Sequence, residues 1–311
     1  MTTPAISVVV LSYRARERIA LPLESLRSQT VAEPYEVIVV DSGDDDCAAY
    51  VRERYPEVRV VRSERRLSPG AARNRGAAAA TAPFVAFLAD DCRVTPDWLG
   101  RRLSKHREGY AAVGGAVTNG TAFHPVGSAG YYLEYSAVMA SQRILAEQPI
   151  PHSLSYERTL IERVGGFCED TLSGEDTVFN QRCVELGVPI AVDARIRIAH
   201  RNITRLGAYL RHQHAHGRGL VQCRRHLGGL GTVPPSPLAL ARWAFVGYPR
   251  LRWWNALKRI ARGKPRRLPA YVLLSPLIWM GLWAAAAGYW AEARAERREW
   301  LVGLVAPDAG D

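Results

Sequence analysis

Carboxylates stand directly behind apolar, β-branched runs in the first third of this 311-residue chain. Asp41 ends the run YEVIVVD, Asp90 and Asp91 follow FVAFLA, and Ser12 follows a third run, ISVVVL. Paired carboxylates are oxygen ligands for a hard divalent cation, and substrate phosphates commonly fill the remaining ligand positions of such an ion. The pattern therefore indicates a site for a divalent metal ion and a nucleotide diphosphate.

The elements that must position these residues alternate between strands and helices. We expect strands at 6–11, 35–41, 58–61 and 84–88, and helices at 15–28, 47–55 and 70–80. This alternation predicts βαβ units in a mainly parallel sheet, and the continuous Val/Ile runs predict that helices cover both of its faces. Ligands of such sheets bind beyond the carboxyl ends of the strands, which is where the carboxylates stand.

Other kinds of site are not favoured. No GxGxxG follows the first strand and no GxxxxGK[ST] occurs, which argues against dinucleotide binding and an NTPase phosphate loop. The five cysteines are scattered without CxxC spacing, so neither a disulfide framework nor a thiolate zinc site is expected. His212 and His216 share a helical face, but His214 points elsewhere and no neighbouring Cys or Glu joins them, so a zinc site is not favoured there.

Six motifs in order carry a family resemblance between about Ile6 and His200. They are VVVLSYR, VIVVDSGDDD, LSPGAARNRG, FVAFLADDCRVTPDWL, GGF and GEDTVFNQRCVELG. Their joint order and spacing resemble the family 2 glycosyltransferases. The resemblance implies an α/β GT-A fold and an inverting transferase that uses a nucleotide-sugar donor.

The resemblance also implies donor-binding residues, namely Ser12, Asp41, Arg73, Asn74 and Asp90. The carboxylate of Asp41 would accept the imide N–H of uracil or thymine, which favours UDP or dTDP as the nucleotide. Asp41 in an Asx turn, and Arg73 and Asn74 at an ordinary helix start, are the structural alternatives.

For the metal, the resemblance implies Mn²⁺ or Mg²⁺ held by Asp91 and His200, although Ala89 stands where many relatives carry another acidic residue. For catalysis it implies that Asp176, beside Glu175, takes the proton of the acceptor hydroxyl. The alternative for this acidic pair is a helix cap and first turn, and both roles can hold together because a helix N-terminus favours a charged carboxylate.

Charge divides the chain near His200. Residues 1–199 carry 23 Lys and Arg against 25 Asp and Glu, whereas residues 200–311 carry 18 against 5, with no carboxylate between Asp193 and Glu292. A surface of this kind is expected to meet an anion: a phospholipid surface, a polyprenyl phosphate or nucleic acid. A nucleic-acid binder is not favoured, because spaced aromatic residues and a reading-helix motif are missing.

Two apolar segments in the C-terminal part of the chain predict association with a membrane. Residues 268–291 lack charge and follow Arg266 and Arg267, so they are expected to be transmembrane or re-entrant, with a buried core helix as the alternative. Residues 234–254 are Trp-rich but interrupted by Pro and Arg, which fits an interfacial helix. The basic residues just before residue 268 are typical of a cytosolic flank, so the catalytic part is expected at the cytoplasmic face of the membrane. No secretory signal pattern precedes the first strand.

The sequence thus predicts a GT-A catalytic domain at 1–205 and a basic helical region with membrane-associated segments at 206–311. The expected partners are a nucleotide-sugar donor, a lipid-linked or glycan acceptor and an anionic membrane surface, without specific nucleic acid. A non-catalytic nucleotide-sugar or glycan-binding scaffold on the same fold is the alternative function.

Overall fold

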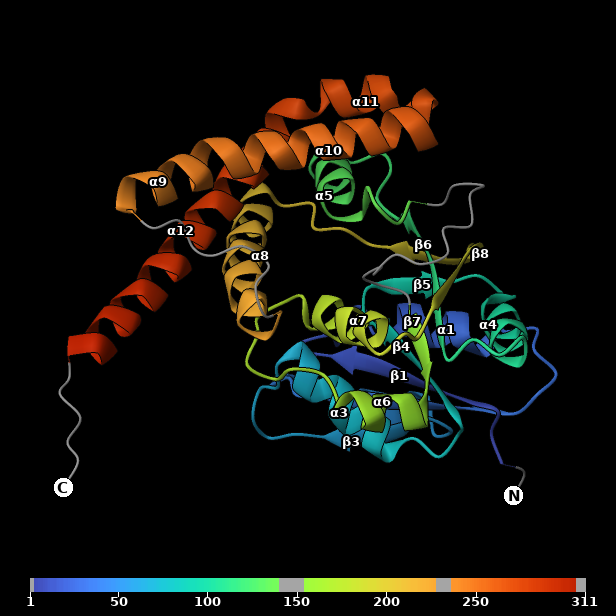
Figure 1. The fold of residues 1–311 in the computed structure, drawn as a ribbon. Coiled ribbons are helices and arrows are strands. Elements are labelled where there is room, and N and C mark those ends of the chain that lie inside the picture. Colours follow the sequence, from blue (N-terminus) through green and yellow to red (C-terminus); the bar gives the residue numbers. More distant parts are fainter. Residues whose placement is uncertain (1–2, 140–153, 228–235, 306–311) are drawn as a thin grey trace, which may run out of the picture. The chain divides into compact units, whose positions relative to one another are not determined.

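The structure is a computed structural model that describes residues 3–139, 154–227 and 236–305, with side chains up to residue 296. The chain divides into two compact units (Figure 1). Unit 1 contains residues 1–123, 135–171 and 175–202, and unit 2 contains 124–134, 172–174 and 203–311. Each unit is described by itself.

Unit 1 is built on one eight-stranded sheet in the order β3-β2-β1-β4-β7-β6-β8-β5. The strands are β1 Ile6–Ser12, β2 Tyr35–Asp41, β3 Arg59–Arg62, β4 Phe84–Ala89, β5 Cys92–Val94, β6 Ala112–Asn119, β7 Leu154–Glu157 and β8 Ile190–His200. The four predicted strands are confirmed, and β1 pairs in parallel with β2 and β4. The sheet as a whole is mixed, because β7 runs antiparallel to both β4 and β6, and β5 runs antiparallel to β8.

Helices connect the strands of unit 1. They are α1 Ala20–Arg27, α2 Cys47–Arg54, α3 Pro69–Ala79, α4 Trp98–Arg107, α6 Arg158–Val164 and α7 Glu175–Glu185. The helix expected from residue 15 begins only at Ala20, because the Ala15 carbonyl accepts from the N–H groups of Arg18 and Ile19 in a preceding turn. Helix α3 begins at Pro69, since the Ser68 hydroxyl caps it by accepting from the Ala71 N–H.

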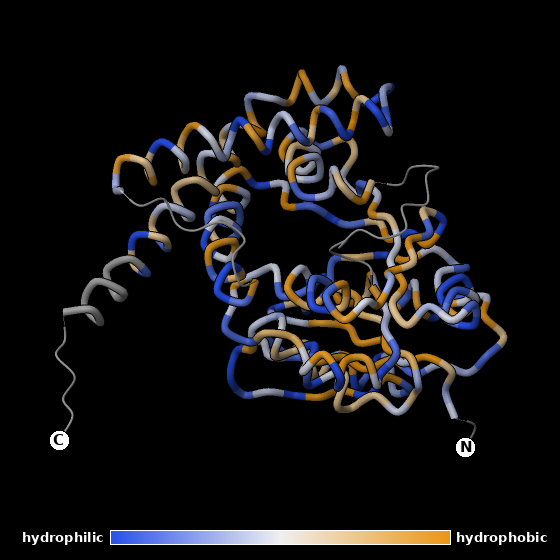
Figure 2. Tube along the Cα trace, viewed as in Figure 1, coloured by the Kyte–Doolittle hydropathy of each residue, from blue (hydrophilic) through white to orange (hydrophobic). Residues whose placement is uncertain are grey.

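The core of unit 1 follows the central strands. Ile6, Val8, Val9 and Val10 of β1 are fully buried, as expected for a strand covered on both faces. Figure 2 shows hydrophobic residues gathered on these strands, whereas helices α9 to α11 mix hydrophobic and hydrophilic residues along their length.

Unit 2 is helical. It contains most of α5 Pro125–Tyr135, followed by α8 Leu206–His226, α9 Pro237–Arg242, a π-helical turn Trp243–Gly247, α10 Tyr248–Gly263, a 3-10 turn Pro265–Arg267, α11 Leu268–Leu273 and α12 Ser275–Val305. Helices α8 and α12 pack side by side at glycines. A Cβ at Gly217 would lie 1.9 Å from the Ala285 carbonyl oxygen, and one at Gly288 would lie 1.9 Å from that of His214. Only glycine permits this approach of the two backbones.

The predicted membrane segments are not confirmed as spans. Within the described residues, no single helix combines the length and apolar character needed to cross a bilayer; segments 265–273 and 275–296 meet that test only as a pair, with a 72° bend between them. The break has a local reason, because Pro276 stands in the first turn of α12, where proline begins a helix and cannot continue one. Of the expected interfacial segment, residues 234–235 lie outside the described residues.

Candidate active site

Strand register brings three of the predicted donor-binding residues, Ser12, Asp41 and Asp90, to one edge of the sheet. Ser12 pairs with Asp41 across β1 and β2, and Leu11 pairs with Ala89 across β1 and β4. Asp90 therefore begins the turn that leaves the same edge. The carboxyl ends of parallel strands meet here, as the spacing along the chain predicts.

Asp41 is fully buried and already engaged within the protein. Its Oδ1 accepts hydrogen bonds from the Ser12 hydroxyl at 3.0 Å and from the Gly43 N–H at 3.2 Å. Its Oδ2 accepts one from the Arg62 guanidinium at 2.7 Å. The Asx turn expected as an alternative is thus present, and its partner Arg62 is a residue that the sequence did not single out. Arg62 ends β3, so the rule that singled out the other strand ends also applies to it.

Asp90 is held by a second arginine that sequence reasoning missed. Its two carboxylate oxygens accept from Arg18 at 2.7 and 3.1 Å, and the Tyr13 N–H donates to it at 3.3 Å. Burial raises the pKa of Asp90 above its ordinary value, while Arg18 opposes this shift. No sequence spacing pointed to Arg18, which lies in the turn before α1.

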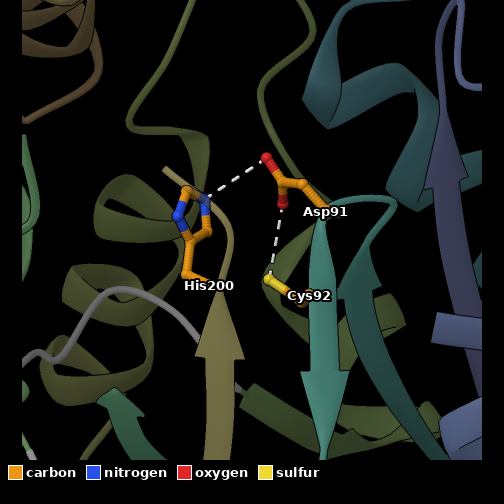
Figure 3. Close-up of side chains that lie close together, drawn as sticks. All are labelled: Asp91, Cys92 and His200. Atoms are coloured by element: carbon orange, nitrogen blue, oxygen red, sulfur yellow. Dashed lines mark hydrogen bonds and ion pairs between the residues drawn. The ribbon is translucent and has the colours of Figure 1, made fainter. Parts of the chain in front are cut away.

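Asp91, Cys92 and His200 form a compact cluster (Figure 3). Antiparallel pairing of β5 with β8 sets Cys92 opposite His200 and so brings Asp91 to the imidazole, with 3.4 Å between Oδ2 and Nε2. The Cys92 thiol is 3.5 Å from Asp91 Oδ1, and burial together with the Asp91 charge holds the pKa of this thiol well above its ordinary value. Asp91 and His200 are the two members of this cluster that the sequence predicts as metal ligands.

Asn202 orients the His200 ring. The Asn202 side-chain nitrogen donates to Asn119 Oδ1, Thr121 Oγ1 and the His200 carbonyl, so its oxygen is the atom that faces His200 Nδ1 at 2.9 Å. That oxygen can only accept, so His200 Nδ1 is the donor in this contact. In a neutral ring this tautomer places an unprotonated Nε2 beside Asp91 Oδ2. Two acceptor atoms that face each other fit a shared cation.

The donor set also distinguishes between metals. One carboxylate and one imidazole fit a divalent ion that completes its shell with diphosphate oxygens and water. The imidazole nitrogen is a softer ligand than oxygen and favours Mn²⁺ over Mg²⁺.

Glu175 and Asp176 open helix α7, as the sequence predicts for a first turn. Glu175 is buried and forms an ion pair with Arg73 of α3, a contact between two residues that were predicted for different roles. Burial and the neighbouring Asp176 raise the pKa of Glu175 above its ordinary value, against the opposing charge of Arg73. Asp176 is 5% exposed, and its Oδ1 accepts from the Thr177 N–H at 2.7 Å.

Asn74 binds the loop that carries the GGF motif. Its side-chain nitrogen donates to the Phe167 carbonyl at 2.9 Å and to Glu169 at 2.7 Å, and its oxygen accepts from the Phe167 N–H at 2.8 Å. The structure thus gives Asn74 a positioning contact between α3 and this loop. Its contact with a donor nucleotide stays a prediction.

Parts of this chain are similar in sequence to known glycosyltransferases. Residues 7–148 match the family model described as Glycosyl transferase family 2. The putative glycosyltransferase EpsH of Bacillus subtilis is 36% identical over 107 residues, which cover 33% of this chain and 30% of that protein. The pre-mycofactocin glycosyltransferase of Mycobacterium tuberculosis is 29% identical over 278 residues, or 80% of this chain and 57% of that protein. The chain thus spans less than two thirds of the length of these relatives.

Solved structures share the fold. Mannosyltransferase PcManGT from Pyrobaculum calidifontis, in complex with GDP-Man and Mn²⁺, has a TM-score of 0.59 at 21% identity, covering 96% of this chain and 88% of that one. TarS from S. aureus in complex with UDP-GlcNAc has a TM-score of 0.55 at 18% identity, covering 94% and 92%. Over residues 7–148 the chain is thus similar to the family 2 glycosyltransferases, and its mixed α/β fold is that of the solved transferases.

Proposed function

We propose that this protein is a divalent-metal-dependent, inverting glycosyltransferase that moves a sugar from a nucleotide-sugar donor to a lipid-linked or glycan acceptor. One observation carries the proposal. Asp91 Oδ2 and His200 Nε2 lie 3.4 Å apart, close enough to share one cation, in the same unit that places Ser12 and Asp41 at the carboxyl edge of the sheet. A scaffold without turnover would need neither Asp91 nor Asp176, so the presence of both favours an enzyme.

The proposed donor carries UDP or dTDP. An Asp41 carboxylate is an acceptor and fits the imide N–H of uracil or thymine. Arg62 forms an ion pair with that carboxylate and would be the side chain that moves aside for a base. The complexes of related fold contain UDP-GlcNAc in one case and GDP-Man in the other, so the preference rests on Asp41.

The proposed chemistry is a single displacement. Asp91 and His200 would hold the cation, which when bound stabilises the negative charge of the departing diphosphate. Asp176 accepts the proton of the acceptor hydroxyl while that oxygen bonds to the anomeric carbon and the bond from this carbon to the diphosphate oxygen breaks. Attack opposite the leaving group inverts the configuration. Arg73 neutralises Glu175, so Asp176 is the carboxylate of this pair that acts as the base.

The proposed place of action is the cytoplasmic face of a membrane. Nine of the fourteen exposed large hydrophobic side chains in the described part of the chain lie between Leu238 and Trp283. The same stretch contains no carboxylate and is rich in arginine. Apolar side chains for the acyl boundary and cations for anionic headgroups support an interfacial, membrane-bound protein and a lipid-linked acceptor.

The test is thermal unfolding of the full chain with UDP, dTDP, GDP or CDP, each with and without Mn²⁺. A nucleotide at 100 times its dissociation constant should stabilise the protein by about 2.7 kcal/mol. We expect UDP or dTDP to stabilise the unaltered protein and the surface control Glu53→Gln, and only when Mn²⁺ is present. Neither nucleotide should stabilise Asp91→Asn. Equal stabilisation of Asp91→Asn would overturn the metal site, and no stabilisation by any nucleotide would favour the scaffold.

A further inference from the structure

Helices α5 and α8 of unit 2 bring together three side chains that bind metals. We infer that Glu134, His212 and His216 form a site for a Zn²⁺-class transition-metal ion, separate from Asp91 and His200. His212 Nε2 lies 3.3 Å from Glu134 Oε1, and the rings of His212 and His216 are 4.3 Å apart. One ligand atom from each of the three residues lies within 4.8 Å of the other two.

The spacing of the two histidines is suited to a shared ion. Residues four apart lie one turn along the same helical face, so both imidazoles of α8 project to the same side. A zinc site was not expected at this pair, because no carboxylate stands near it along the chain. The fold brings the Glu134 carboxylate from α5 to the pair, a partner that the sequence did not predict.

Neighbouring contacts hold the two helices in register. Gln213 is 3% exposed and donates a hydrogen bond to Glu134 Oε1, which orients the carboxylate. One turn earlier on each helix, the fully buried ring of Tyr209 lies against Gly130, where an added Cβ would be 3.5 Å from the ring. Outer contacts of this kind preorganise ligands before the ion arrives.

The ligand types indicate which ion the site takes. Two imidazoles and one carboxylate match Zn²⁺, whereas Mg²⁺ and Ca²⁺ prefer oxygen ligands. Three protein ligands leave a fourth position for water or an anion. The His212 side chain is 37% exposed, so an ion reaches the site from solvent. Bound there, it would join α5 to α8.

The test uses Zn²⁺ and the spectroscopic probe Co²⁺ with the full chain, free of any affinity tag and stripped of metal by a chelator. We expect one equivalent of Co²⁺ to give the absorption of a tetrahedral ion and Zn²⁺ to displace it. Loss of a residue that only supports a metal ligand weakens metal binding by about 10–100-fold. Loss of a ligand itself, in His212→Ala or His216→Ala, should therefore weaken binding by at least about 100-fold. Glu134→Gln keeps the side-chain volume and should also weaken binding.

Two control variants show whether the ion binds at this cluster. His214→Ala changes an exposed histidine on the same helix and should bind the ion as the unaltered protein does. Asp91→Asn should also keep the tetrahedral spectrum, which distinguishes this site from the proposed donor site. Equal Zn²⁺ affinity of folded His212→Ala and the unaltered protein would overturn the inference, leaving a Glu–His contact that only packs α5 on α8.

Discussion

Asn202 accepts from Nδ1 of the proposed metal ligand His200 and so orients its ring, and removal of Asn202 tests that role. In Asn202→Ala, His200 Nδ1 loses this hydrogen-bond partner, and the ring keeps its contacts with Tyr135 and Asp91. Loss of such an outer contact should weaken Mn²⁺ binding by about 10–100-fold, measured by Mn²⁺ titration of the nucleotide-dependent stabilisation. Arg201→Ala removes only an exposed neighbouring side chain and should leave Mn²⁺ affinity unchanged. Unchanged affinity in Asn202→Ala would show that His200 needs no such support.

The proposed role of Asp176 as the catalytic base can be tested by changing this residue alone. Asp176→Asn removes the proposed base and should lower kcat by about 10²–10⁴-fold, measured as nucleoside diphosphate release, while nucleotide binding persists. Glu185→Gln changes an exposed carboxylate at the other end of α7 and should keep the full rate. A fully active Asp176→Asn protein would rule Asp176 out as the base.

At the scale of elements, the tie between α3 and the loop at residues 165–169 depends on two adjacent glycines with positive φ. Gly165 has a φ of +84° and open space around it, whereas a Cβ on Gly166, at φ +76°, would lie 2.9 Å from Asn74 Oδ1. Gly165→Ala should therefore cost only the left-handed strain, about 1–2 kcal/mol in the free energy of unfolding. Gly166→Ala should cost more, because it also displaces the Asn74 hydrogen bonds.

Urea unfolding of a double-mutant cycle measures that difference. In an Asn74→Ala background the bonds are already lost, so Gly166→Ala should cost about the same 1–2 kcal/mol as Gly165→Ala. An equal cost of Gly166→Ala in both backgrounds would show that Asn74 does not hold this loop.

Helix α4 presents a buried histidine to the sheet, and this histidine makes stability depend on pH. His106 hydrogen bonds with the Tyr110 carbonyl and the Ser155 hydroxyl. Burial, opposed by the bond to the Tyr110 carbonyl and aided by the charge of Arg102, lowers the pKa of His106 to about 4. The unfolded chain, with a His pKa of about 6.5, then binds the proton more readily, so stability is lost as the pH falls from about 6.5 toward 4.

This loss can be assigned to His106 by comparison with His106→Gln. Between pH 7.5 and pH 5 the histidine should remove about 2 kcal/mol from the free energy of unfolding. Over the same pH interval, the free energy of unfolding of His106→Gln should fall by about 2 kcal/mol less than that of the unaltered protein. Urea unfolding at both pH values measures the difference. Identical pH dependence of the two proteins would mean that the folded state accommodates the charged imidazole.

At the scale of the whole molecule, the basic and apolar stretch of unit 2 predicts binding to lipid vesicles. Vesicles with anionic lipid should bind the full chain, and binding should weaken as salt rises from about 0.1 to 1 M, because salt shortens the range of the charge attraction. Replacing exposed Trp254 and Leu273 by serine should weaken the vesicle binding that persists at high salt, by about 1.5 kcal/mol for each side chain. Vesicle sedimentation measures both effects.

Leu186→Ser is the matched control, because it removes an exposed leucine from unit 1. It should sediment with vesicles as the unaltered protein does. Equal vesicle binding by all variants, or the absence of binding to anionic vesicles, would contradict the proposed membrane association.

Much of the fold follows from the sequence by itself. The strands before Ser12, Asp41 and Asp90 and the first turn of α7 lie where local patterns predict them, because β-branched runs, turn residues and caps act within a few residues. Parallel pairing then brings the strand ends to one edge, so the approximate position of the candidate site was also predictable.

Only the tertiary structure decided which side chains meet. Arg18 binds Asp90, Arg62 binds Asp41, and Arg73 binds Glu175 of α7. In unit 2, Glu134 joins a histidine pair that looked isolated along the chain. Spacing along one chain carries no information about such partners, because they come from different elements and their contacts depend on strand register and helix packing.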